Sequence, residues 1–170
     1  MANRYFGYDL LSSLNALAAD STNGINAVIT AINTERSLIG DAAAPAIKNI
    51  SNSFPKGYLP ELIIDIDSSE VMADEDTFGG GGSTFALRDT NKTPEVFKVL
   101  ISVMHKSTNL YLPNWMELYA EAIYRAFHNY CDAGITWMIA TSSIRADLQI
   151  TEGQTGKICG YEFEVRVDYA

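Results

Sequence analysis

Apolar side chains recur every three or four positions through the first forty residues of the chain. This spacing places them on one narrow side of an α-helix, and such a side needs a partner to cover it. The stripe keeps its register across residues 21–24, whose sequence STNG favours a break. It therefore predicts a helical region over residues 8–38, as one bent helix or two nearly collinear ones. This region can cover the protein's own core or a neighbouring subunit. The stripe consists of Leu11, Leu14, Ala18, Ser21, Ile25, Val28 and Ile32.

Four later segments carry the alternating pattern of β-strands. Residues 59–69 (LPELIIDIDSS) predict a first strand and residues 95–107 (EVFKVLISVMHKS) a second, which has one fully apolar face and one mixed face. Residues 135–150 predict a strand that bends around Ser142 and Ser143. Residues 158–169 (ICGYEFEVRVDY) alternate strictly, which is typical of an antiparallel strand with one buried and one wet face.

A second helix is predicted over residues 114–131, between the second and third strands. Asn114 and Glu117 have the spacing of a capping box at its start, and apolar side chains line one side of it. Residues 39–58 have no regular period and are interpreted as a connector. This order of elements predicts a single α+β domain over residues 1–170, with a mostly antiparallel four-stranded sheet and helices packed on one face.

Composition narrows the range of functions. The chain has 21 acidic and 12 basic residues, a net charge of −9, which disfavours a protein whose outer surface binds nucleic acid. Cys131 and Cys159 do not have the spacing of a zinc site or of a disulfide framework, so two reduced thiols are expected. We find no apolar run of membrane-spanning length and no signal-peptide pattern at the start. We therefore expect a cytosolic protein, unless it leaves the cell inside a larger particle.

A long stretch without a steady pattern, residues 67–93, separates the first two predicted strands. It contains four consecutive glycines from Gly79 to Gly82. The Lys-Ser/Thr pair that ends a phosphate-binding loop does not follow them, and no helix is expected to begin there. We interpret the stretch as a long Gly-rich loop that gains order against a neighbouring molecule.

Candidate chemistry is sparse. Asp65, Asp67, Ser69 and Asp76 follow the ligand spacing of a calcium loop, but Glu70 stands where that loop needs glycine, so no metal site is predicted. His105 lies at the end of a predicted strand and His128 on the wet face of a predicted helix, and neither has a nucleophile at a spacing that would indicate a triad. We therefore expect no catalytic residues and no cofactor. An enzyme or small-ligand module is the less favoured alternative. Its only candidate catalytic or binding residues are Asp65, Asp67, His105 and His128.

Several segments taken together carry a family resemblance. They are VFKVLISVMHKS at residues 96–107, ELYAEAIYRAFHNY at residues 117–130, and a closing antiparallel pair that ends in YEFEVRVDY at residues 161–169. This order resembles the tail terminator (tail completion, neck) proteins of long-tailed bacteriophages. YLPELIIDIDSSE at residues 58–70 is similar to the strand that follows the N-terminal helix in that family, so the resemblance runs over most of the chain. The long N-terminal helical region and the glycine-bearing loop depart from the shorter members.

The resemblance implies a small α+β subunit that assembles with copies of itself into a ring, usually six-fold. Such a ring caps the head-proximal end of the tail tube, stops its polymerisation and offers a docking surface to the head connector. DNA passes through without specific binding, and no membrane is involved. The protein would be assembled in the cytoplasm of the host bacterium and reside in the neck of the virion. A head-closure or head–tail adaptor protein and a tail tube subunit are the alternatives.

In such a ring, acidic side chains facing the lumen would repel phosphate, and the glycines would let their loop reach a neighbouring subunit or the tube. The candidate interface or lumen residues are Asp74, Glu75, Asp76, Phe78, Gly79, Gly80, Gly81, Gly82, Phe85 and Arg88.

Overall fold

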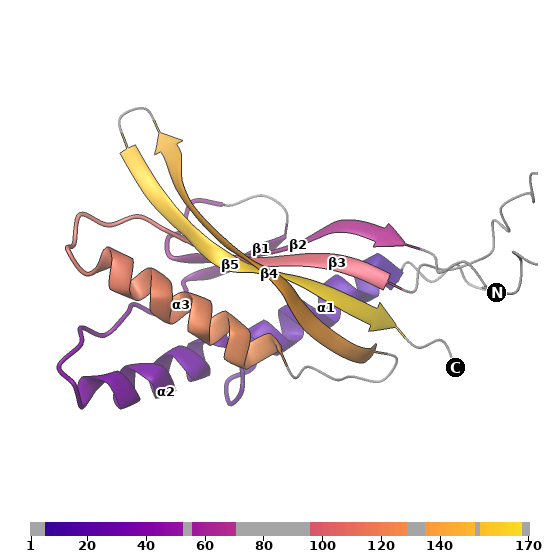
Figure 1. The fold of residues 1–170 in the computed structure, drawn as a ribbon, viewed down its shortest axis with the longest axis horizontal. Helices are drawn as coiled ribbons and strands as arrows, with labels where there is room; N and C mark the ends of the chain where they lie inside the picture. The colour runs from indigo at the N-terminus through magenta and orange to yellow at the C-terminus, as the bar shows by residue number, and fades with distance from the viewer. Residues whose placement is uncertain (1–5, 53–55, 71–95, 129–134, 152–153, 168–170) are drawn as a thin grey trace, which may run out of the picture.

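Three helices and five strands make up the part of the chain that the structure describes (Figure 1). The structure is a computed structural model, and it describes residues 6–52, 56–70, 96–128, 135–151 and 154–167. None of the described helices is both long enough and apolar enough to cross a membrane. The elements in chain order are α1 (Phe6–Ala19), α2 (Ile25–Ser37), β1 (Asn49–Asn52), β2 (Glu61–Glu70), β3 (Val96–His105), α3 (Leu112–Phe127), β4 (Ile135–Thr151) and β5 (Gln154–Val167).

The strands form one mixed sheet in the order β1-β2-β3-β5-β4. β1 runs parallel to β2, whereas the other neighbouring pairs are antiparallel. β4 and β5 form a long hairpin that reaches beyond the other strands (Figure 1). β4 and β1 therefore lie at opposite edges of the sheet.

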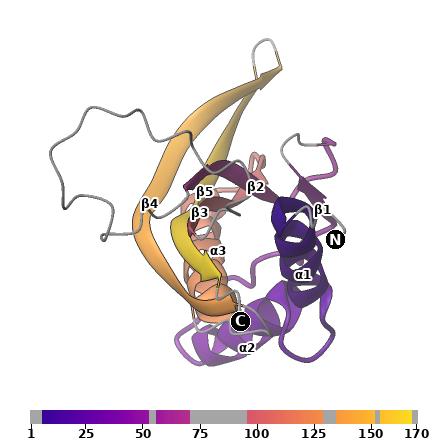
Figure 2. The same cartoon turned by 90° about the vertical axis from the view of Figure 1, so that its right-hand side faces the viewer.

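The core lies between the helices and one face of the sheet (Figure 2). β3 contributes Phe97, Val99, Ile101 and Val103, all buried as their alternation predicts. β5 passes very close to β3 beside them: a Cβ added to Gly160 would lie 2.2 Å from the carbonyl oxygen of Ile101, so only glycine fits there. α3 covers these strands with Leu118, Tyr119, Ala122, Ile123 and Phe127, each at most 3% exposed.

The α+β class is confirmed, but the prediction of four strands is wrong, because the sheet of the described residues has five strands and is mixed, with one parallel pair and three antiparallel pairs. The additional strand is β1, whose sequence NISN lies inside residues 39–58, interpreted above as a connector. A short, largely polar strand has no alternation by which it could be recognised. It is visible only through its parallel pairing with β2, from Asn49 opposite Glu61 to Asn52 opposite Ile64.

The predicted N-terminal helical region consists of two helices, α1 and α2, with a turn at residues 20–24. The Oδ1 atom of Asp20 accepts hydrogen bonds from the N–H groups of Thr22 and Asn23 at 2.8 and 2.6 Å, and Gly24 is the N-cap of α2. The apolar stripe faces the protein's own core, as the first of the two alternatives predicted. Four members of the predicted stripe are buried: Leu14, Ala18, Ile25 and Ile32. Leu11 and Val28 are partly buried and Ser21 is exposed, whereas Leu10 and Ile29, which the predicted stripe did not include, are buried beside it.

α3 begins earlier than the sequence predicted. Its N-cap is Tyr111, which makes no side-chain capping hydrogen bond, and Pro113 lies in the first turn. The predicted capping box of Asn114 and Glu117 is therefore not the start of this helix. Instead, Asn109 stabilises the turn that leads into α3, because its Oδ1 accepts a hydrogen bond from the Tyr111 N–H at 3.0 Å.

Candidate functional site

The residues predicted to form an interface or lumen loop lie outside the described part of the chain. They span Asp74 to Arg88, within residues 71–95. The predicted role of the four glycines, and of the acidic residues beside them, therefore stays a prediction.

The residues that matched a calcium-loop pattern lie in a strand. β2 continues to Glu70, so Asp65, Asp67 and Ser69 belong to extended chain, whereas Asp76 lies outside the described residues. Ser68, Ser69 and Glu70 pair with β3 along the same ladder. Over the described ranges, no three side chains of His, Cys, Asp or Glu are grouped as metal ligands would be.

The two histidines lie at opposite ends of α3. The ring of His105 packs against Trp115 and Tyr119, with centroids 5.8 and 6.0 Å away, near the start of that helix. His128 is the C-cap of the same helix and contacts the ring of Tyr124 at 4.5 Å. The 13 residues from Trp115 to His128 span about 20 Å of helix, so the two imidazoles do not form one site.

His105 is buried, and both of its ring nitrogens lack a hydrogen-bond partner in the described part of the chain. Burial, and to a smaller extent the positive charge of Lys48, lower the pKa of His105. A neutral imidazole packed between two aromatic rings is expected from these surroundings. The residue therefore belongs to the core, whereas the sequence alone placed it only at the end of a strand.

The polar cluster around Glu61 has no signal in the sequence pattern. This carboxylate is fully buried at the start of β2 and accepts hydrogen bonds from Asn49 Nδ2 at 2.8 Å and Ser51 Oγ at 2.7 Å. It also accepts from the N–H groups of Lys56, at 2.8 and 2.9 Å, and Gly57, at 3.0 Å. Burial by itself raises the pKa of Glu61, but these hydrogen bonds outweigh it and hold the pKa below its ordinary value. One ionised side chain thus joins β1, β2 and the turn before β2.

A second group of contacts holds residues 41–48, which we call the strap, against α2 and α3. Asn26 pairs with both backbone groups of Ile47, at 3.0 and 2.7 Å, and Asn33 pairs with both backbone groups of Ala44, at 2.9 and 2.9 Å. From α3, Trp115 Nε1 donates to the carbonyl of Ala42 at 3.2 Å, and the Tyr119 hydroxyl donates to that of Pro45 at 2.8 Å. In all of these hydrogen bonds, a side chain of a helix binds a backbone atom of the strap.

The spacing of the two asparagines matches the strap. Seven residues of helix separate Asn26 from Asn33, a rise of about 10.5 Å. Three residues of extended chain separate Ala44 from Ile47, a length of about 10 Å. An asparagine pair with this separation on a predicted helix, followed by a segment without period, is the only sequence signal for the strap.

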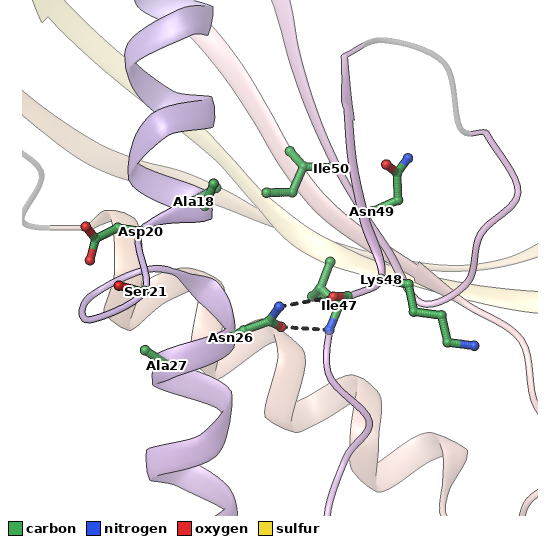
Figure 3. Close-up of a pocket in the computed structure, with 10 residues that line it drawn as sticks. Ala18, Asp20, Ser21, Asn26, Ala27, Ile47, Lys48, Asn49 and Ile50 are labelled. Carbon is green, nitrogen blue, oxygen red and sulfur yellow. Dashed lines mark hydrogen bonds between the residues drawn. The ribbon is translucent and has the colours of Figure 1, made fainter.

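The described surface includes two open hollows beside helix ends. The larger, about 420 Å³, lies between the turn after α1 and residues 47–50. Figure 3 shows its two charged residues, Asp20 and Lys48, on opposite sides and pointing away from one another, with the Asn26–Ile47 pair between the elements. The smaller, about 300 Å³, lies between the start of α3 and the β4–β5 hairpin. It includes Cys159, whose thiol is buried, and burial raises its pKa to about 12.

The feature with the clearest capacity for binding is the outer edge of β4. This strand runs for 17 residues and pairs only with β5 among the described strands. Its side chains from Thr141 to Ser143 and from Arg145 to Asp147 are exposed. An open edge strand presents a row of backbone donors and acceptors to which another strand can pair.

Large apolar side chains are also exposed at two turns that flank helices. Leu38 and Ile39, after α2, are 87% and 74% exposed, and Leu110, before α3, is 93% exposed. Both turns lie at the same end of the molecule, on the left in Figure 1. Isolated exposed apolar residues are common, but apolar residues exposed near one another can mark a surface that binds another protein.

Comparisons with known proteins leave the family open. No family model matches the chain, and no curated protein matches it. Among solved structures, the chain is similar to one from the virion of a native gene transfer agent (GTA) particle, with 16% identity and a TM-score of 0.41. That alignment covers 91% of this chain and 98% of the other. A likeness at this level carries no argument about fold or function.

Proposed function

We propose that this protein is a structural subunit of a bacteriophage virion and acts as a tail terminator. Copies of the chain form a ring, hexameric in the favoured arrangement, at the head-proximal end of the tail tube. The ring stops tube polymerisation and presents a surface to the head connector. Its partners are therefore itself, the tail tube protein and a neck or connector protein.

The observation that most supports self-assembly is the open edge of β4. A monomer that works alone usually covers or shortens such an edge, because an exposed strand invites pairing. Here the edge strand is 17 residues long and its central residues are exposed. The choice of a tail terminator among assembling proteins comes from the sequence resemblance at residues 58–70, 96–107, 117–130 and 161–169.

A ring places a further demand on each subunit, because neighbours in a cyclic assembly meet through two unlike surfaces. The chain offers several candidates. The edges of the sheet, β4 and β1, lie on opposite sides, and the exposed turns at Leu38–Ile39 and Leu110 form a third region. The net charge of −9 suits a passage that DNA crosses without being held.

Electron microscopy of the purified protein, alone and with tail tubes from a phage that lacks its terminator, tests the proposal. We expect closed rings of uniform diameter, and tubes that carry one ring at one end and no longer elongate. An equally acidic protein of similar size serves as the control for nonspecific effects on tube length. Open-ended tubes built from this protein alone would identify a tube subunit, and rings that bind the connector but never the tube would identify an adaptor.

A further inference from the structure

The central part of β4 is a regular strand whose outer edge is not paired by any strand of the described residues. Its pairing with β5 is uninterrupted from Ser142, opposite Glu162, to Gln149, opposite Thr155, and register shifts flank this stretch on both sides. Figure 2 shows β4 at the outer side of the sheet. Within the described ranges, β5 is the single strand that pairs with it.

Side chains along this stretch divide between two faces. Arg145 and Asp147 lie on the face that carries α3, because Arg145 pairs with Glu117 of that helix and Asp147 pairs with Lys157 of β5 at 2.6 Å. Since side chains alternate along a strand, Ile144, Ala146 and Leu148 lie on the opposite face. Ile144 and Leu148 are half-buried, and Ala146 between them is exposed.

We propose that two copies of this chain pair through their β4 edges, antiparallel and two-fold symmetric, with Ala146 of each copy at the axis. In this register Arg145 of one copy lies opposite Asp147 of the other, and the symmetry repeats the pair. On the other face Ile144 lies opposite Leu148 of the second copy, also twice. The two alanines meet at the centre, where the small side chain allows close approach.

Charge selects this register over its neighbours. A shift by two residues in one direction places Arg145 opposite the second copy's Arg145, and a shift in the other direction places the two Asp147 carboxylates face to face. Like charges directly opposite one another destabilise a strand pair. A shift by one residue turns the second copy over and places Arg145 opposite alanine, so both charge pairs are lost.

The proposed register also extends ion pairs that exist within each copy. Glu117, Arg145, the second copy's Asp147 and its Lys157 would alternate in sign along the α3 face of the joined sheet. Charges on an edge strand can instead keep it from pairing. Here their order is self-complementary about Ala146, and this feature favours pairing with a second copy over protection of the edge.

This inference does not rest on the proposed function. A two-fold contact closes at two copies, so it cannot build a ring by itself. It describes the protein before assembly, with the β4 edges covered by one another. A protein that dimerises in this way but never acts on tail tubes would refute the tail terminator proposal and leave this one standing.

Charge exchange tests the register. Arg145→Glu places like charges opposite Asp147 at both symmetric positions, and Asp147→Arg does the same opposite Arg145. We expect each variant to weaken dimerisation about tenfold or more, measured by sedimentation equilibrium at low salt. The double variant Arg145→Glu/Asp147→Arg restores opposite charges across the axis and should recover the dimer. The double variant still lacks the two intrachain ion pairs, Arg145 with Glu117 and Asp147 with Lys157. If the single variants weakened the dimer by disturbing the structure of one copy, the double variant would therefore not restore it.

Glu117→Gln is the matched control, because it removes the intrachain partner of Arg145 and leaves the cross-axis pairs in place. We expect its dimerisation constant to stay within about threefold of the wild-type value. A wild-type protein that remains monomeric at the concentrations used would overturn the proposal. Single and double charge variants that behave alike would do so as well.

A cysteine at the axis gives a direct measure of geometry. Opposite residues of an antiparallel pair have Cβ atoms about 4.5–5.5 Å apart, close enough for a disulfide after small adjustment. Ala146→Cys should therefore form a covalent dimer under mild oxidation. Ser142→Cys, exposed on the same face but four residues from the axis, should cross-link no more than the wild type. Equal cross-linking of the two variants would contradict the register.

Discussion

Replacing Glu61 with glutamine tests whether a buried charge holds the sheet edge in place. The amide keeps one oxygen, which can still accept from Asn49, Ser51 and Lys56. Its NH₂ group replaces the second carboxylate oxygen, to which the Gly57 N–H donates at 3.0 Å in the wild type. In the variant two donors face each other, and the Gly57 N–H loses its acceptor. A buried donor that loses its acceptor costs about 1–3 kcal/mol. For a chain of this size, each kcal/mol lowers the melting temperature by about 2–4 °C.

The effect has a definite pH dependence. The pKa of Glu61 in the folded protein lies below its unfolded value, which is about 4.3. Its contribution to stability is therefore complete above that value and is lost as the pH falls through the folded pKa. The difference in unfolding free energy between wild type and Glu61→Gln should stay constant from pH 8 to pH 6 and narrow below about pH 4.3.

Urea unfolding followed by circular dichroism at several pH values measures this difference directly. Asp67→Asn is the matched control, because it neutralises an exposed carboxylate on the same strand and should change stability by less than about 0.5 kcal/mol. If Glu61→Gln unfolds with the wild-type free energy at pH 7, or if the difference widens on acidification, Glu61 is buried in its protonated form and the reasoning is wrong.

Three further predictions concern other parts of the core. Asn26→Ala should lower the unfolding free energy by about 1–3 kcal/mol and speed amide exchange at Ile47, whereas Asn23→Ala in the preceding turn should do neither. Gly160→Ala should lower the free energy of unfolding by more than about 3 kcal/mol, because the added Cβ would clash with the Ile101 carbonyl oxygen. Gly40→Ala is the control: its Cβ would enter open space, and its φ of 83° should lower the free energy of unfolding by about 1 kcal/mol, measured by thermal unfolding. Because the pKa of His105 is lowered, wild-type stability should fall as the pH drops below about 6.5, and His105→Leu should flatten that slope in urea titrations.

The elements that sequence predicted well are those whose stability comes from one buried face. β3, β5 and α3 each bury a regular set of apolar side chains, so their periods predict both the element and the residues that face the core. The bend expected near Ser142 corresponds to a register shift between Ala140 and Ser142. In these cases a local pattern and the tertiary structure require the same residues.

β1 and the strap could not be predicted, because distant side chains hold them. β1 depends on the carboxylate of Glu61, and Asn15 of α1 also reaches it, donating to Asn52 Oδ1 at 2.9 Å. The strap depends on asparagines and aromatic residues from two helices. The β4 edge was missed for another reason: the sequence identifies a strand but does not say which of its sides remains unpaired.

The strap has an unusual consequence for how the chain can vary. Apart from the ion pair between Asp41 and Arg36, the helix contacts described above reach its main-chain atoms. Ala44 and Ile47 bury their side chains, whereas Ala43 and Ala46 are exposed and can be exchanged for most other amino acids at little cost. Its length cannot change in the same way. One residue inserted or deleted between Ala44 and Ile47 would move one backbone group about 3.3 Å out of reach of its asparagine. Surface connections usually accept insertions and deletions more readily than the elements they join. Here the number of residues between Ala44 and Ile47 is constrained, whereas the amino acids at Ala43 and Ala46 are not.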